Sequence, residues 1–275
     1  MNASEIKQMN TICREIRLLT MEEIGNLGVG HLGGSMSVID ALAVLYYRHM
    51  NVDPKNPKME GRDRFVLSKG HAGPALYATL AHKGFFDKEM LMTLNQPGTN
   101  LPSHADMNKT PGVDMTAGSL GQGFSCAVGI AIASKLSGDG ANVFSIVGDG
   151  ESEEGIIWEA AMYAAHKKLD NLVGFTDYNK MQIDGPTNDV SAIEPLADKW
   201  RAFGWHVIEA DGHDVAEIDA AISLAKAYKE KPTMIILHTF KGKGVSFLEE
   251  NWQNNHNVTI SQEQLEIARR ELKEV

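Results

Sequence analysis

The sequence has few cysteines and no long hydrophobic run. Cys13 and Cys126 are the two cysteines among its 275 residues and form no CxxC pair, which indicates neither a disulfide framework nor a thiolate zinc site. No apolar run approaches the roughly 18 residues of a membrane span, and residues 1–19 are too charged for a signal peptide. We therefore expect a cytoplasmic protein that does not bind membranes.

Positive charge is also scarce. The chain has 26 Lys and Arg against 36 Asp and Glu, which gives a formal net charge of -10 and a pI of about 5.5. This balance disfavours unaided binding to nucleic acid or to an anionic membrane. An anionic ligand would therefore need donors placed locally around it.

Strand and helix patterns alternate along the chain. Apolar periodicity predicts a helix over residues 4–25, and runs such as NVFSIV alternate with helical segments such as IIWEAAMYAAHKKL. This alternation predicts an α/β fold with a doubly wound, mainly parallel sheet and helices on both faces, in three layers. We expect one domain over residues 1–260 and a charged helical tail over residues 261–275.

Polar side chains follow two consecutive predicted strands. Asp149 lies between two glycines just after one strand, and Asn179 lies at the end of the next. A GDG turn or a capping Asn is common when taken alone, but ligands of parallel sheets bind at these strand ends. One carboxylate and one amide oxygen suit Mg²⁺ or Ca²⁺ that is also held by a phosphate. The joint placement favours a metal site.

The other acids of the GDGESEEG stretch have different expected roles. Glu151 and Glu153 open the following helix, where carboxylates are favoured, so a structural role is sufficient for both. Glu154 precedes Gly155, and a buried or interface carboxylate is possible there.

Two glycine-rich motifs could bind an anion. GVGHLG at residues 28–33 matches GxGxxG literally, but a predicted helix precedes it rather than a strand, which disfavours NAD. Oriented amides in this turn, or in GSLGQG at residues 118–123, could hold a diphosphate.

Loop histidines are the third unusual feature. A single loop histidine is usually just exposed, and their spacing fits no zinc helix, but several imidazoles at one site would suit hydroxyl-rich substrates and proton transfer. We expect His49, His82 and His166, in helical segments, to be surface or packing residues. The loop set consists of His31, His71, His104 and His256.

These motifs together resemble the thiamine-diphosphate domain of transketolases. The motifs that carry the resemblance occur in order from about residue 5 to residue 260: GHLGGS, RFVLSKGHAGPALYA, SHAD, GSLGQG, VGDGESEEGIIWEA, DYNKMQIDG and FKGKGVSF. The chain most resembles the amino-terminal subunit of a split transketolase, in which the first third of the usual enzyme is a separate polypeptide.

The resemblance implies a role for each matching position. Asp149, Asn179 and the backbone carbonyl of Met181 would bind Mg²⁺, or Ca²⁺ or Mn²⁺, and Gly150 and His71 would contact the diphosphate. Gly118 and Leu120 would hold the aminopyrimidine. The implied cofactor-binding set is His31, His71, Gly118, Ser119, Leu120, Asp149, Gly150, Glu154, Asn179, Met181, Ile183, Lys243 and His256. The implied catalytic set is His31, His71, His104, His256 and Glu154, with Glu154 relaying to a partner chain.

The resemblance also implies a missing half of the site. Transketolases supply an activating glutamate and substrate-binding arginines from a pyrimidine-binding domain, which this chain lacks. A C-terminal partner subunit is therefore expected, in an α2β2 heterotetramer, and the chain is expected to be inactive alone. The implied reaction moves a two-carbon ketol unit from a ketose (phosphate) to an aldose (phosphate), as in pentose phosphate metabolism.

Other functions stay open on the sequence. One is another thiamine-diphosphate enzyme, such as a 2-oxoacid dehydrogenase alpha subunit or a deoxyxylulose-phosphate synthase, and SKGHAG with GHLGG and SHAD favours the transketolase branch over it. The second is an NAD-dependent enzyme, and the third is a non-catalytic subunit. The sugar is also open, because sugar phosphates, apulose phosphate and sulfo-sugars are all conceivable.

Overall fold

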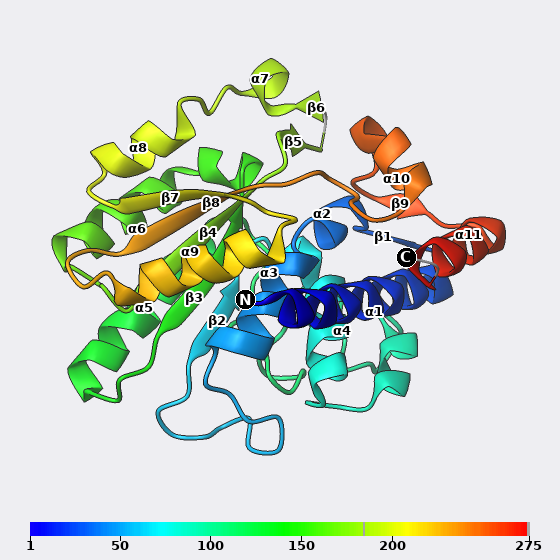
Figure 1. The fold of residues 1–275 in the computed structure, drawn as a ribbon, viewed down its shortest axis with the longest axis horizontal. Coiled ribbons are helices and arrows are strands. Elements are labelled where there is room, and N and C mark those ends of the chain that lie inside the picture. The colour runs from blue at the N-terminus through cyan, green and yellow to red at the C-terminus, as the bar shows by residue number, and fades with distance from the viewer. Residues whose placement is uncertain (184, 274–275) are drawn as a thin grey trace.

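The computed structural model, which describes residues 1–183 and 185–273, is built around a five-stranded sheet (Figure 1). The strand order is β2-β3-β4-β8-β7, and every neighbouring pair is parallel. The predicted α/β fold with a parallel sheet is confirmed. The strands are β2 (Arg64–Leu67), β3 (Val143–Gly148), β4 (Leu172–Tyr178), β7 (His206–Asp211) and β8 (Thr233–His238).

Helices cover both faces of this sheet (Figure 1). Strand side chains alternate between the faces, so Phe144 and Ile146 belong to one apolar core and Val143 and Val147 to the other. Burial on both faces explains why β3 reads as an apolar run that only Ser145 interrupts. One face carries α5 (Gln122–Ser137), α6 (Gly155–His166) and α8 (Leu196–Ala202). The other carries α1 (Ala3–Leu27), α3 (Ile39–Val44), α4 (Gly73–Lys83) and α9 (Val215–Ala227).

Helix α1 begins earlier and ends later than residues 4–25 because both of its ends are capped. The Asn2 side chain accepts a hydrogen bond from the Glu5 amide at 3.0 Å, and the Glu5 carboxylate accepts one from the Asn2 amide at 2.7 Å. At the other end Gly28 has φ 91°, in the left-handed region that glycine adopts without strain.

Short elements connect the layers. Strand β1 pairs antiparallel with β9, and β5 pairs antiparallel with β6. The β1–β9 pair brings the segment before β9 to the loop that follows β1, although their sequence positions differ by more than two hundred residues. The short elements are β1 (Val29–Gly30), α2 (Gly33–Met36), β5 (Met181–Gln182), β6 (Gly185–Pro186), α7 (Thr187–Val190), α10 (Ser246–Glu250) and β9 (Val258–Thr259).

Helix α11 (Gln262–Lys273) lies along α1 (Figure 1). Leu265, Ala268 and Leu272 of this helix belong to the same apolar core as α1. Leu265 sits so close to Gly25 that a Cβ added there would be 3.1 Å from the leucine methyl carbons. The expected tail therefore packs onto the domain, and its positions 274 and 275 lie outside the described residues.

Across residues 1–183 and 185–273, none of the helices combines the length and apolar character that crossing a bilayer requires.

Candidate cofactor and metal site

A cavity of about 640 Å³ opens at the carboxyl ends of β3 and β4. Its wall comes from the loops after β2, β3, β4 and β8, together with the loop after β1 and the segment before β9. Most residues predicted for the site line this cavity: His31, His71, His104, Gly118, Leu120, Asp149, Gly150, Glu154, Asn179, Met181, Ile183 and His256.

Two predicted cofactor residues lie elsewhere. Ser119 is exposed and is not part of the cavity wall. Lys243 is also outside it and pairs with Glu249 at 3.3 Å. The lysine of FKGKG that lines the cavity is Lys241, which is 3% exposed. Within this motif, the position of Lys241 at the cavity wall makes it the better candidate for contact with a bound anion.

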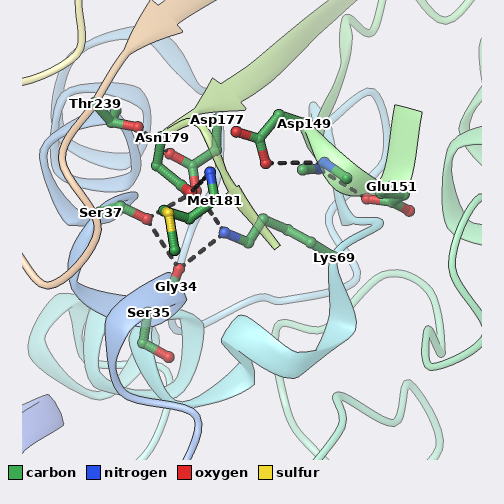
Figure 2. Close-up of polar contacts among 12 residues, drawn as sticks. Gly34, Ser35, Ser37, Lys69, Asp149, Glu151, Asp177, Asn179, Met181 and Thr239 are labelled. Atoms are coloured by element: carbon green, nitrogen blue, oxygen red, sulfur yellow. Dashed lines mark hydrogen bonds and ion pairs between the residues drawn. The ribbon is translucent and has the colours of Figure 1, made fainter. Parts of the chain in front are cut away.

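The register of β3 and β4 brings Asp149 and Asn179 together. Gly148 pairs with Asp177, so the residues just beyond both strands share one edge of the sheet. The Asp149 amide donates to the Asp177 carbonyl at 3.2 Å, which continues the strand pairing by one step. The structure therefore confirms the prediction that the ends of these two strands lie side by side (Figure 2).

Asp149 is a buried carboxylate that accepts hydrogen bonds from two backbone amides. Its Oδ1 accepts from the Gly150 amide at 2.8 Å and its Oδ2 from the Lys180 amide at 2.5 Å. Burial, and next the nearby charge of Asp177, raise the pKa of Asp149 to about 7. A divalent cation against this carboxylate would offset both effects.

The amide of Asn179 is oriented by its neighbours. Its Nδ2 donates to Asp177 at 2.9 Å, and its Oδ1 accepts from the Met181 amide at 3.1 Å (Figure 2). In residues 1–183 and 185–273, no group of three or more His, Cys, Asp or Glu could hold a metal ion. One carboxylate, one amide oxygen and one backbone carbonyl fit a hard cation whose other ligands are phosphate and water oxygens, as Mg²⁺ prefers.

Sequence reasoning missed the buried ion pair behind this edge. Asp177 is fully buried and accepts from Lys69 Nζ at 2.5 Å, Ser37 Oγ at 2.7 Å and Thr239 Oγ1 at 2.5 Å (Figure 2). Burial alone would raise its pKa, but Lys69 and these donors lower it. Lys69 Nζ also donates to the Gly34 carbonyl at 2.9 Å. An acid within the otherwise apolar strand β4 was the signal available in the sequence.

Glu151 does more than suit a helix start. It is 3% exposed, and its Oε1 accepts from Ser68 Oγ at 2.5 Å and from the Gly121 amide at 2.8 Å. Its Oε2 accepts from the Gly148 amide at 2.9 Å. The carboxylate therefore joins the loops after β2 and β3 to the start of α5. Its role is structural, but the side chain acts inside the protein rather than at an exposed helix end.

The next two acids differ from Glu151. Glu153 is exposed and accepts a hydrogen bond from Gln182 Nε2 at 2.8 Å. Glu154 is exposed at the cavity and, in the described part of the chain, makes no side-chain hydrogen bond or ion pair. An exposed carboxylate at this rim is available to a second chain.

Four histidines face one another across the cavity. The ring centroid of His31 lies 5.7 Å from that of His71, 5.8 Å from that of His104 and 5.2 Å from that of His256. The predicted loop histidines are therefore together in space.

Burial lowers the pKa of three of these histidines, His31, His71 and His256, which favours their neutral form. Burial, and next the charge of Lys69, hold the pKa of His71 well below its ordinary value. Burial, and next Lys241, lower the pKa of His256 to about 3. A neutral imidazole has one donor and one acceptor nitrogen, which suits hydroxyl groups and proton exchange.

The glycines of GHLGG allow two loops to approach each other. A Cβ at Gly33 would lie 2.2 Å from Asn255 Oδ1, so only glycine fits beside this loop. The Gly33 amide donates to the Asn255 carbonyl at 2.8 Å and is therefore occupied within the fold. This contact, with the β1–β9 pairing, brings His256 to His31. In GSLGQG, Gly123 packs against the Ser68 backbone, where a Cβ would be 2.7 Å away.

The cavity also has the charges that a diphosphate requires. Lys69 and Lys241 line it, and burial, followed by the charge of Lys69, lowers the pKa of Lys241 to about 8. On a chain of net charge -10, these ammonium groups supply the local positive charge that the composition lacks.

A parallel sheet with Asp149 and Asn179 at its strand ends, and with two lysines and four histidines at the same cavity, suits a cofactor that carries a diphosphate. The chain matches the family described as transketolase, thiamine diphosphate binding domain, over residues 8–273, and it belongs to that family.

Named relatives include separate transketolase subunits. The chain is 58% identical over 257 residues to the 6-deoxy-6-sulfo-D-fructose transketolase subunit SqwG of Clostridium sp. (strain MSTE9), covering 94% of this chain and 93% of that one. It is 42% identical to an apulose-4-phosphate transketolase subunit of Phocaeicola vulgatus, over 89% of this chain and 86% of that one.

Solved transketolases have the same fold. The transketolase of Campylobacter jejuni superposes with a TM-score of 0.90 at 32% identity and covers 99% of this chain. The match takes in 43% of that transketolase chain, so this protein corresponds to less than half of it.

Proposed function

We propose that this chain is the N-terminal subunit of a two-chain transketolase. It binds thiamine diphosphate through a divalent metal ion and, with a C-terminal partner subunit, transfers a two-carbon ketol unit from a ketose to an aldose. The observation that carries the proposal is the cavity that joins Asp149 and Asn179 to the four histidines. The length supports it as well, because the chain spans nearly all of a transketolase subunit but 43% of a transketolase.

The residues of the cavity divide the work of holding the cofactor. The Asp149 carboxylate, Asn179 Oδ1 and the Met181 carbonyl would hold Mg²⁺, or Ca²⁺ or Mn²⁺, and His71 with Lys241 would contact the diphosphate. When bound, the cofactor supplies the nucleophilic carbon that cleavage of a carbon–carbon bond requires.

The chain's own contribution to the reaction is placement and proton handling. His31, His104 and His256 present imidazoles that orient the hydroxyl groups of a ketose and exchange protons with them. Glu154 lies exposed at the rim of the cavity, where its carboxylate is accessible to a residue of the partner subunit. The α2β2 assembly and the cytoplasm as its compartment belong to the same proposal.

We extend the proposal to the sugar. The identity of 58% to a sulfo-sugar transketolase subunit, against 42% to an apulose-4-phosphate subunit, favours 6-deoxy-6-sulfo-D-fructose as the ketose donor. Removal of two carbons from this six-carbon ketose leaves a four-carbon aldose that keeps the sulfonate.

Donor competition tests this proposal. The chain, reconstituted with its partner subunit, is offered 6-deoxy-6-sulfo-D-fructose, apulose 4-phosphate or fructose 6-phosphate with one aldose phosphate acceptor, and the products are measured by mass spectrometry. We expect kcat/KM for the sulfo-sugar to exceed the others by about tenfold or more. Equal or faster use of either phosphate would contradict the choice of sugar, and turnover of pyruvate instead of any ketose would contradict the transketolase reaction.

A further inference from the structure

A second cavity, of about 800 Å³, lies at the amino end of β2, between the loop that leads into this strand and residues 107–114. In Figure 1 that loop lies at the end of the molecule opposite β5 and β6. The cavity wall contains five cationic side chains and one acid. The cations are Lys55, Lys58, Arg62, Arg64 and Lys109. Such a cluster of positive charge is unexpected on a chain of net charge -10, and it suits the binding of an anion.

Two arginines at this cavity are not fully paired with acceptors or negative charges in the described structure. Arg62 pairs with Asp114 and donates from Nη1 to the Asp63 carbonyl at 3.1 Å, but its buried Nε has no partner in the described structure. Arg64 forms no ion pair within the described ranges and donates to the Arg62 carbonyl. Burial, and next the charge of Arg62, lower the pKa of Arg64, and the opposing charges of the nearby carboxylates do not offset them.

The other nearby acids are engaged elsewhere. Asp63 Oδ1 accepts from the Asn142 amide at 2.7 Å, and its Oδ2 accepts from the Asn51 amide at 2.8 Å. Asp139 Oδ1 accepts from the Ala141 amide at 2.9 Å. These carboxylates hold backbone turns together and form no ion pair with Arg62 or Arg64 in the described structure, so the two guanidinium groups can still accept an external anion.

The three lysines and an apolar wall define the ligand further. Lys55, Lys58 and Lys109 are exposed and form no ion pair in residues 1–183 and 185–273, so they can close on several anionic groups. Met107 and Ile130 add apolar surface to the same wall. We propose that this cavity is an anion-binding site for a polyphosphorylated small molecule, separate from the cavity at the strand ends.

Calorimetric titration of the full chain with inorganic tripolyphosphate and with ATP tests the site. Both titrations are carried out with saturating thiamine diphosphate and Mg²⁺, which fill the strand-end cavity. We expect saturable binding that persists under this condition, and no binding of adenosine. Tighter binding of ATP than of tripolyphosphate would identify a nucleotide as the ligand, and equal binding would identify the phosphate chain alone.

Variants locate the binding. The triple substitution Lys55→Gln, Lys58→Gln and Lys109→Gln should weaken tripolyphosphate binding by about tenfold or more. A control with Lys167→Gln, Lys229→Gln and Lys231→Gln changes the net charge equally at exposed positions elsewhere and should leave it unchanged. Arg64→Gln, checked for folding by circular dichroism, should weaken it as well.

Three results would overturn the proposal. One is the absence of saturable binding, and another is equal loss of binding in the two triple variants. The third is displacement of tripolyphosphate by a polyglutamate peptide that binds more tightly, which would assign the cavity to an acidic polypeptide instead.

Discussion

Asp149 is buried at the end of β3, and hydrogen bonds orient both its carboxylate and the side-chain amide of Asn179 at the end of β4. A turn that served only the fold would not require this arrangement. With the partner subunit present, Asp149→Ala and Asn179→Ala should each weaken binding of thiamine diphosphate in the presence of Mg²⁺ by about tenfold or more, because each removes a proposed metal ligand. Calorimetric titration measures this. The exposed neighbours Asp189 and Asn188 provide matched alanine controls. Undiminished binding in both site variants would remove the metal assignment.

Glu151 and Glu153 form a second matched pair, in which burial decides the outcome. Glu151→Ala leaves the Gly148 and Gly121 amides and Ser68 without their buried acceptor, so it should cost about 2–4 kcal/mol of unfolding free energy. Glu153→Ala, at an exposed position, should cost less than about 0.5 kcal/mol. Urea denaturation measures both, and equal costs would show that the carboxylate of Glu151 is not structural.

His256 should make stability depend on pH. Its pKa of about 3 in the folded chain is below the ordinary value of 6.5, mainly through burial and then through Lys241. The unfolded chain binds more protons between these values, so the contribution is fully present above the unfolded pKa and is lost as pH falls. From about pH 7 to about pH 5, wild type should lose about 1 kcal/mol more unfolding free energy than His256→Asn.

The urea midpoint at each pH measures this difference. His166→Asn, at an exposed helical position, should keep the wild-type pH dependence. An unchanged dependence in His256→Asn would show that His256 is not held neutral by the fold.

Strand β3 and helix α1 show which elements can be predicted from sequence. An apolar run of strand length and a helical period are local patterns, and the parallel sheet follows from their alternation. The strand ends then bring Asp149 and Asn179 together. The pairing of β1 with β9, and the ion pair of Lys69 with Asp177, depend on contacts between distant segments. No local pattern encodes them, and no local pattern tells which lysine of FKGKG lines the cavity.

Helix α11 offers a test at the level of packing. Leu265→Ala removes a buried side chain from the contact between α11 and α1, so we expect a loss of about 2–4 kcal/mol in unfolding free energy. Leu224→Ala, at a helical position that is 60% exposed, should change it by less than about 0.5 kcal/mol. Thermal and urea unfolding measure both. A negligible effect of Leu265→Ala would mean that residues 262–273 are dispensable for the domain.

In the proposed function, the molecule as a whole supplies one side of a reaction site. The strand-end cavity contains Asp149 and Asn179, two lysines and four histidines, and Glu154 lies exposed at its rim. The chain spans 43% of the transketolase of Campylobacter jejuni. The family resemblance implies a second polypeptide, and a sequence of one chain has no local pattern that could specify the residues this second polypeptide contributes.

Reconstitution of ketol transfer is the decisive experiment for a site divided between two chains. The purified chain and its partner are assayed separately and together, with Mg²⁺, at increasing partner ratios and with thiamine diphosphate present or omitted. We predict no transfer by either chain alone, transfer that rises to a plateau at an equimolar ratio, and loss of transfer when thiamine diphosphate is omitted. Transfer by this chain alone, or transfer by the pair without thiamine diphosphate, would contradict the proposed function.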